Sequence, residues 1–286
     1  MSRDKLFVMS QYLAPQHFLS RSAGRLADCK IKSIKNPMID WFIKQYGVDM
    51  SEALIEDPHA YAHFNDFFTR ALKPGARDID STESALVSPV DGTISQLGDI
   101  ENGRIFQAKG QHFTLNELIG GKAELAAPFE GGKFSTIYLS PKDYHRIHMP
   151  LRGTLRDMVY IPGKLFSVNP ATTEQVPGLF ARNERVAAIF DTEIGPVAMV
   201  LVGAMIVASI ETVWAGLVAP NSRTLYHTQY GQGDGAIALE KGEEMGRFKL
   251  GSTVVMLFPK DTVEFSDKMI ANAGVRMGQH FAKIRS

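Results

Sequence analysis

The hydrophobic pattern of the chain changes near residue 75. Before that point, apolar residues recur at helical spacing over residues 4–28, 36–48 and 63–72. Polar and basic residues occupy the positions between them, so each segment is amphipathic. The pattern predicts an N-terminal amphipathic helical region over residues 1–75.

A polar link with Pro and Gly, "KPGARDID" at 73–80, separates this region from a different pattern. Short apolar runs then alternate with Gly, Asp and Asn, as in "ALVSPVDGTISQLG", "KFSTIYLS" and "STVVMLF". This alternation is typical of an antiparallel sandwich or barrel, and "TLNELIGG" is a helical insertion within it. We therefore predict an α+β protein with one β-rich domain over 76–286, mostly antiparallel and sandwich- or barrel-like.

The most apolar segment lies at residues 196–211, "PVAMVLVGAMIVASIE", in which the 14 residues 197–210 carry no charge. A helix that spans a membrane needs about 20 such residues. The Val, Ile and Gly content favours two buried strands instead. The first residues of the chain also lack the long apolar run and the small-residue cleavage site of a secretory signal.

Composition narrows the class of protein. The 31 basic and 31 acidic residues cancel, so we expect no nucleic-acid partner. A single cysteine, Cys29, excludes a disulfide within one chain and a thiolate metal cluster. The aromatic, basic N-terminal region has two interpretations, which are a helical cap on the core and a segment that lies on a membrane surface.

One serine near the C-terminus has more than one interpretation. In "GRFKLGST", Gly246 and Gly251 have the spacing of a phosphate-binding loop, but Ser252 stands where that loop needs its lysine. A nucleotide site is therefore not expected. Ser252 is either a turn residue before a buried strand or a nucleophile.

A histidine pair offers acid/base or metal chemistry. "YLSPKDYHRIHMP" places Asp143, His145 and His148 within six positions. Histidines three apart in a turn can bind a metal, although no further ligand is evident. Each can instead act as an acid or a base near neutral pH, or form a hydrogen bond with the backbone.

An aspartate upstream can complete a catalytic group. Asp91 and Gly92, in "SPVDGTI", form the strongest short signal for a hairpin turn. Asp91 can alternatively orient an imidazole, because triads depend on geometry and not on chain order. Asp91, His148 and Ser252 can therefore meet across the fold, but the G-x-S-x-G elbow of the α/β-hydrolases is absent.

These segments occur together with other short motifs in one order along nearly the whole chain. The others are "FNDFFTR" (64–70), "QAKG" (107–110), "PGKLFSVN" (162–169), "LFARNERV" (179–186) and "VGAMIVASIETVW" (202–214). With "PVDGTI", "YHRIHMP" and "LGST", the chain resembles the bacterial, pyruvoyl-dependent phosphatidylserine decarboxylases. Val90 departs from the pattern, where a smaller residue is expected, and affects no chemistry.

The resemblance implies self-cleavage of a proenzyme between Gly251 and Ser252. His148 is implied as the base that deprotonates Ser252, and Asp91 as the residue that orients His148. Attack of Ser252 on the Gly251 carbonyl then gives an ester, and elimination followed by hydrolysis converts Ser252 to a pyruvoyl group.

The implied products are a large chain, 1–251, and a small chain, 252–286, that begins with the pyruvoyl group. This cofactor is expected to form a Schiff base with phosphatidylserine and to release CO2, giving phosphatidylethanolamine in phospholipid biosynthesis. The resemblance implies His145 as the proton donor and Ser167 as a contact to the substrate. It requires no metal.

A lipid substrate changes the interpretation of the N-terminal region. The resemblance implies a peripheral enzyme on the cytoplasmic side of the cell membrane, bound to an anionic surface through residues 1–45. It also implies a heterodimer of the two cleaved chains, and a homodimer of that unit. The alternatives are a zinc hydrolase that uses Asp143, His145 and His148, and a membrane-associated β module without catalysis.

Overall fold

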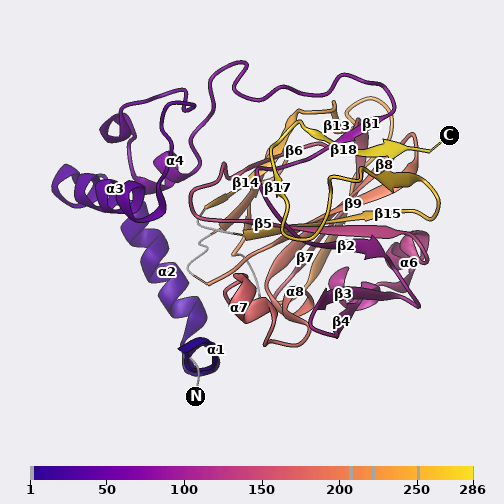
Figure 1. The fold of residues 1–286 in the computed structure, drawn as a ribbon, viewed down its shortest axis with the longest axis horizontal. Helices are drawn as coiled ribbons and strands as arrows, with labels where there is room; N and C mark the ends of the chain where they lie inside the picture. The colour runs from indigo at the N-terminus through magenta and orange to yellow at the C-terminus, as the bar shows by residue number, and fades with distance from the viewer. Residues whose placement is uncertain (1–2, 206–208, 221–222, 250–251, 286) are drawn as a thin grey trace.

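A computed structural model describes residues 3–205, 209–220, 223–249 and 252–285 of the chain. The protein is α+β, with N-terminal helices beside a body of antiparallel sheets, as expected from the sequence (Figure 1). In Figure 1, α1 to α3 lie along one side of the body, whereas the C-terminus lies on the opposite side.

The N-terminal helices differ in extent from the predicted segments. The segment 4–28 forms two helices, because Pro15 lacks an amide hydrogen and disfavours helical backbone in the residue before it. The segment 63–72 gives only one turn and a half of helix. The elements are α1 (Arg3–Leu13), α2 (Gln16–Ala27), α3 (Lys32–Tyr46), the 3-10 turn η1 (Pro58–Ala60) and α4 (Phe64–Phe68).

Short helical turns interrupt the β-rich part. The predicted insertion forms α5, whose first turn is closed by a reciprocal capping box between Thr114 and Glu117. These turns are α5 (Leu115–Leu118), α6 (Ala123–Ala126), η2 (Ala127–Phe129), α7 (Pro170–Thr173) and α8 (Leu179–Arg182).

A nine-stranded antiparallel sheet forms the centre of the body, in the order β12-β7-β8-β9-β15-β5-β2-β17, with β13 also paired to β7. Its middle strands are buried on both faces, so they are continuously apolar. The strands are β2 (Gly92–Asp99), β5 (Lys133–Leu139), β7 (Gly153–Ile161), β8 (Arg185–Thr192), β9 (Gly195–Val202), β12 (Tyr226–Gln229), β13 (Ala238–Leu239), β15 (Ser252–Phe258) and β17 (Gly274–Val275).

Three smaller antiparallel sheets accompany the large one. A four-stranded sheet has the order β11-β10-β14-β6, a three-stranded sheet has the order β1-β18-β16, and β3 pairs with β4. Their strands are β1 (Ala85–Val87), β3 (Arg104–Ala108), β4 (Gln111–Thr114), β6 (Arg146–His148), β10 (Ser209–Thr212), β11 (Gly216–Ala219), β14 (Glu244–Lys249), β16 (Val263–Phe265) and β18 (His280–Ile284).

The apolar segment 196–211 contributes two buried strands, β9 and β10, as its composition predicted. Residues 206–208 of that segment lie outside the described part of the chain. Because β9 belongs to the nine-stranded sheet and β10 to the four-stranded sheet, this segment joins the two sheets.

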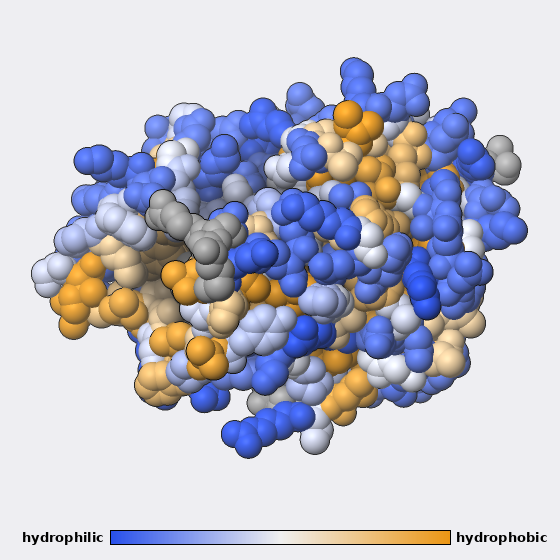
Figure 2. Space-filling view, turned by 60° about the horizontal axis from the view of Figure 1, so that its bottom comes forward, coloured by the Kyte–Doolittle hydropathy of each residue, from blue (hydrophilic) through white to orange (hydrophobic). Residues whose placement is uncertain are grey.

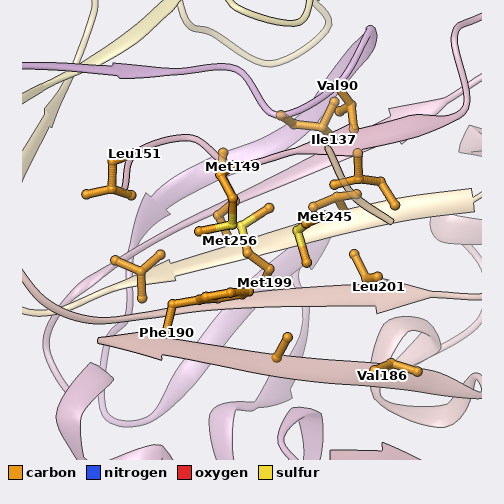
Figure 3. Close-up of a cluster of buried hydrophobic side chains, with 14 of the residues drawn as sticks. Val90, Ile137, Met149, Leu151, Val186, Phe190, Met199, Leu201, Met245 and Met256 are labelled. Atoms are coloured by element: carbon orange, nitrogen blue, oxygen red, sulfur yellow. The ribbon is translucent and has the colours of Figure 1, made fainter. Parts of the chain in front are cut away.

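The main hydrophobic core lies between the nine-stranded sheet and the smaller sheets. Met199 and Met256 of the large sheet pack against Met245 of β14 and Met149, which directly follows β6 (Figure 3). A second core lies on the other face of the large sheet, under α5 to α8. The N-terminal helices have a separate aromatic cluster around Phe42 and Phe67.

The outer faces of the N-terminal helices are unusually apolar. Leu13, Phe18 and Trp41 are among the most exposed large apolar side chains of the protein. In Figure 2, apolar residues gather on the side where α1 to α3 lie in Figure 1. Of the helices that the structure describes, none combines the length and hydropathy needed to cross a bilayer.

Candidate active site

Ser252 is the first residue of β15, at the point where the chain enters the nine-stranded sheet. It pairs with Leu139 of β5, whereas Lys249 ends β14 in the four-stranded sheet. The residues between Lys249 and Ser252, 250 and 251, lie outside the described part of the chain, so the expected cleavage bond before Ser252 does too. Ser252 is fully buried, and its Oγ has no hydrogen-bond partner among the described residues. A buried hydroxyl without a partner is unusual and costs about 1–3 kcal/mol.

His148 ends β6, which pairs with β14, the strand that leads toward Ser252. Its Nδ1 lies 2.8 Å from the Gly242 carbonyl oxygen. Because a carbonyl only accepts, Nδ1 carries the hydrogen, and the lone pair is on Nε2. Burial lowers the pKa of His148 below its usual value. The imidazole is therefore neutral, in the tautomer that a base needs.

The Nε2 atom of His148 is already engaged. The Tyr144 hydroxyl lies 3.0 Å from it, and burial raises the pKa of Tyr144, so the phenol keeps its proton and donates. Tyr144 stands inside the "DYHRIH" segment, but no sequence pattern predicts a role for it. Its contact with His148 depends on the bend of residues 141–145, which sequence spacing does not specify.

His145 is more deeply enclosed than His148. Its ring lies 4.0 Å from the Phe68 ring, and Nδ1 donates to the Asp143 carbonyl oxygen at 2.8 Å. Its Nε2 is buried without a partner among the described residues. Burial lowers the pKa of His145 to about 3. In this state His145 is neutral and must take up a proton at Nε2 before the ring can act as a cationic acid.

Asp91 lies between β1 and β2 and is held by a cation. The Arg77 guanidinium donates to both carboxylate oxygens, with Nε 2.9 Å from Oδ1, and the Met277 amide also donates to Oδ1. The hairpin interpretation of Asp91–Gly92 is wrong, because β1 and β2 belong to different sheets. Gly92 is needed for a close approach: a Cβ there would lie 2.5 Å from the Tyr138 carbonyl oxygen.

The three expected triad residues lie in adjoining segments but are not joined by hydrogen bonds. The His148 amide donates to the Pro89 carbonyl oxygen at 2.9 Å, which brings the Asp91 segment alongside β6. Within the described residues, Asp91 binds Arg77, His148 binds Tyr144 and Gly242, and Ser252 Oγ binds nothing. Catalytic hydrogen bonds often tighten only when the reaction proceeds.

A cavity of about 440 Å³ connects several charged groups of this region. Asp91, Asp143, Arg70, Arg77 and Tyr144 all line it. The Asp143 carboxylate accepts from the amide and the hydroxyl of Ser140, each at 2.7 Å, and burial raises the pKa of Asp143. Arg77 was not predicted as a site residue, because it stands in the segment interpreted as a linker. Its role as the cation that binds the Asp91 carboxylate is visible only in the structure.

The arrangement gives no support to a zinc site. Over the described ranges, no three His, Cys, Asp or Glu side chains come together in a way that could hold a metal ion. Asp143 and the two histidines use their nearest partners for hydrogen bonds to Ser140, to Tyr144 and to backbone carbonyls.

Ser167 lies in the loop after β7 and is held by the N-terminal helices. Its amide donates to Gln11 Oε1 at 2.8 Å, and the Leu165 amide donates to Gln16 Oε1 at 2.8 Å. Both glutamine side chains are buried. Helices α1 and α2 therefore fix the conformation of the loop that carries Ser167.

Comparison with known proteins assigns the chain to a group of related sequences. A family model described as phosphatidylserine decarboxylase matches residues 64–283, and a second model, described as PSD, matches residues 6–47. The phosphatidylserine decarboxylase proenzyme of Pseudomonas fluorescens strain SBW25 is 62% identical over 281 residues, which cover 98% of each chain. That of Bordetella pertussis strain Tohama I is 63% identical over 281 residues, covering 98% of this chain and 95% of the relative.

Proposed function

The chain belongs to the phosphatidylserine decarboxylase family and is a decarboxylase, and on that premise we propose that it converts phosphatidylserine to phosphatidylethanolamine and CO2. We further propose that it is made as a proenzyme that cuts itself between Gly251 and Ser252. The relatives are named proenzymes, which supports this proposal. The observation that carries it is the buried Oγ of Ser252, at the start of β15, which has no hydrogen-bond partner among the described residues.

The proposed cut begins with removal of the Ser252 hydroxyl proton by His148. The fixed Nδ1–H tautomer leaves Nε2 available as the base once Tyr144 releases it. Ser252 Oγ then attacks the Gly251 carbonyl carbon, and the peptide C–N bond breaks to give an ester. Elimination releases the Gly251 carboxylate and leaves dehydroalanine, which water converts to a pyruvoyl group with loss of ammonia.

The surroundings of Ser252 suit a pyruvoyl group. Loss of the Ser252 hydroxyl removes a buried polar atom that has no partner within the described ranges. The new terminus stays fixed because β15 pairs with both β5 and β9. The group would supply an electrophilic carbonyl that bonds the substrate amine and accepts the electron pair left when CO2 departs. His145 is the proposed proton donor, after protonation at Nε2, and Ser167 is a proposed substrate contact.

The N-terminal helices are the proposed membrane contact. Their exposed Leu13, Phe18 and Trp41 can enter the interfacial region of a bilayer without a spanning helix. We propose peripheral binding to an anionic membrane on the cytoplasmic side. The proposed assembly is a heterodimer of chains 1–251 and 252–286, further paired as a homodimer.

The intact mass of the purified protein tests this proposal. We expect two chains, 1–251 and 252–286, with the mass of the second reduced to that of an N-terminal pyruvoyl group. Ser252→Ala should abolish both the cut and CO2 release, because the substituted chain has no nucleophile. A wild-type protein that stays one uncut chain after prolonged incubation, yet releases CO2 from phosphatidylserine, would overturn the maturation proposal.

A further inference from the structure

A second cavity lies near Ser252, and the mechanism proposed above does not use it. It has a volume of about 430 Å³ and lies between α2 and the edge of the nine-stranded sheet where β7 ends and β8 begins. Its walls include His17 and Arg21 of α2, Tyr160 and Glu184 of the sheet, and Arg223.

The strand register places this cavity on the same face and edge of the sheet as Ser252. Thr253 pairs with Val202, which pairs with Arg185. Thr253, Val202 and Arg185 therefore point to one face of the sheet. Ser252 precedes Thr253 and Glu184 precedes Arg185, so the side chains of Ser252 and Glu184 both point to the other face. Two strand spacings separate them, which is about 10 Å. The Gly203 amide donates to the Glu184 carbonyl oxygen at 2.9 Å, which continues the ladder at this edge.

The charges in the cavity suit an anion. Arg21 and Arg223 each bring a guanidinium group to the cavity, and the ion pairs among the described residues include neither of them. Glu184 accepts a hydrogen bond from the Tyr160 hydroxyl at 2.5 Å, and burial raises the pKa of Glu184. The two guanidinium groups exceed its charge even when the carboxyl is ionised. His17 Nε2 donates to the Gly163 carbonyl oxygen at 3.0 Å, which fixes α2 against the cavity wall.

We propose that Arg21 and Arg223 bind the phosphodiester of the substrate head group, an inference that rests on the proposed decarboxylase function. In phosphatidylserine four bonds of roughly 1.5 Å link the amino nitrogen to phosphorus, so the two atoms are at most about 6 Å apart. A guanidinium–phosphate hydrogen bond adds about 2.8 Å. The sum, about 9 Å, is close to the roughly 10 Å that separates Ser252 from Glu184 in the cavity wall.

The α2 residues that line this cavity lie beside exposed apolar residues of the same helix. Phe18 and Leu19, which follow His17 on α2, are exposed on the apolar outer surface of the N-terminal helices. A phosphodiester bound by Arg21 would therefore lie between the reactive amine and a bilayer in contact with α2. The planar fork of arginine binds phosphate oxygens in pairs, which fixes the orientation of the head group.

The test uses the purified, fully cut enzyme and dibutanoyl-phosphatidylserine below its aggregation concentration, so that membrane binding plays no part. The double variant Arg21→Ala/Arg223→Ala should raise KM by about 10- to 100-fold, because charged hydrogen bonds are lost, with kcat within about twofold. The mass of chain 252–286 verifies that the pyruvoyl group is intact. Arg25→Ala is the matched control, since it removes the same charge from α2 outside the cavity.

Calorimetric titration with glycerophosphoserine supplies a readout that is independent of turnover. Wild type should bind this soluble head group, and the double variant should lose that binding. An unchanged KM in the double variant, or an equal rise in Arg25→Ala, would refute the phosphodiester site. Binding by a wild-type protein that releases no CO2 would instead refute the decarboxylase function and leave the site standing.

Discussion

The two histidines of the "YHRIH" segment are three residues apart, yet their surroundings give them different chemistry. Each donates Nδ1–H to a backbone carbonyl, so each directs a lone pair from Nε2. For His148 this atom meets the Tyr144 hydroxyl, whereas for His145 it is sealed beside Phe68. We therefore propose His148 as the base, with Tyr144 as the group that must release its Nε2. Burial suppresses the uptake of a proton by His145.

Alanine substitution of each histidine should separate maturation from turnover. His148→Ala is expected to leave the chain uncut, because Ser252 loses its base. His145→Ala is expected to cut normally but to release CO2 about 10²- to 10⁴-fold more slowly, the usual contribution of a general acid. Denaturing electrophoresis measures the cut, and CO2 release measures turnover. A block of cutting in His145→Ala alone would reverse the two assignments.

The pH dependence of cutting follows from the direction of the pKa shift. The base must be neutral, and burial lowers the pKa of His148 from its usual value near 6.5. We expect the rate of cutting to stay constant as pH falls to about 6.5, and to decrease only at the lower pH where His148 becomes protonated. A rate that already halves at about pH 6.5 would contradict a buried, neutral base.

At the scale of elements, β15 is the strand that would keep the proposed small chain attached to the large one after a cut. All seven of its residues are buried, and it lies between β5 and β9 near the middle of the large sheet. The same small chain supplies β17 to that sheet, and β16 and β18 to the three-stranded sheet with β1. Hydrogen bonds to the large chain therefore hold residues 252–286 at several strands after a cut.

We expect the cut chains to elute together under native conditions and to separate only in denaturant.

Met256→Ala, at a fully buried position of β15, should lower the free energy of unfolding by about 2–5 kcal/mol through loss of packing. Denaturant titration monitored by fluorescence measures this change. The control Lys283→Ala, on the exposed side of β18, should change it by less than about 0.5 kcal/mol. For the elution experiment, spontaneous separation of the two cut chains in native buffer would show that strand pairing does not retain the small chain.

At the scale of the whole molecule, one side of the protein differs from the rest. Helices α1 to α3 present a largely apolar outer surface, while their inner residues contact the β body and the aromatic cluster (Figures 1 and 2). Gln11 and Gln16 connect this side to the loop that carries Ser167. The same helices thus form the proposed membrane surface, one wall of the proposed phosphodiester site and a support of the loop that carries Ser167.

Leu13→Glu/Trp41→Glu should weaken binding to anionic vesicles by about 10-fold or more, because each exposed side chain loses an apolar transfer of roughly 1.5–3 kcal/mol. Cosedimentation with vesicles measures this binding. Activity on monomeric dibutanoyl-phosphatidylserine should persist, since neither residue contacts the site. Ile270→Glu, at an equally exposed position outside the helices, serves as the control. Equal loss in the control would argue against a membrane surface on α1 to α3.

The sequence by itself determined the α+β class, the two patterns that meet near residue 75, the two buried strands of segment 196–211 and the candidates for the proposed chemistry. These depend on periodicity and on short motifs, which reflect local backbone geometry and the burial of one face. The same local reasoning failed for Asp91–Gly92, because a turn signal cannot specify which strands pair across it. Segment 4–28 is helical as expected, and Pro15 divides it into two helices.

Only the tertiary structure decided which partner each reactive group has. The tautomer of His148 depends on the carbonyl of Gly242, far along the chain, and the salt bridge of Asp91 depends on Arg77. The cavity that joins Arg21 to Arg223 exists because α2 packs across the edge of a sheet whose strands come from distant segments. Such contacts follow from the order of strands and the packing of layers, and no local pattern records them.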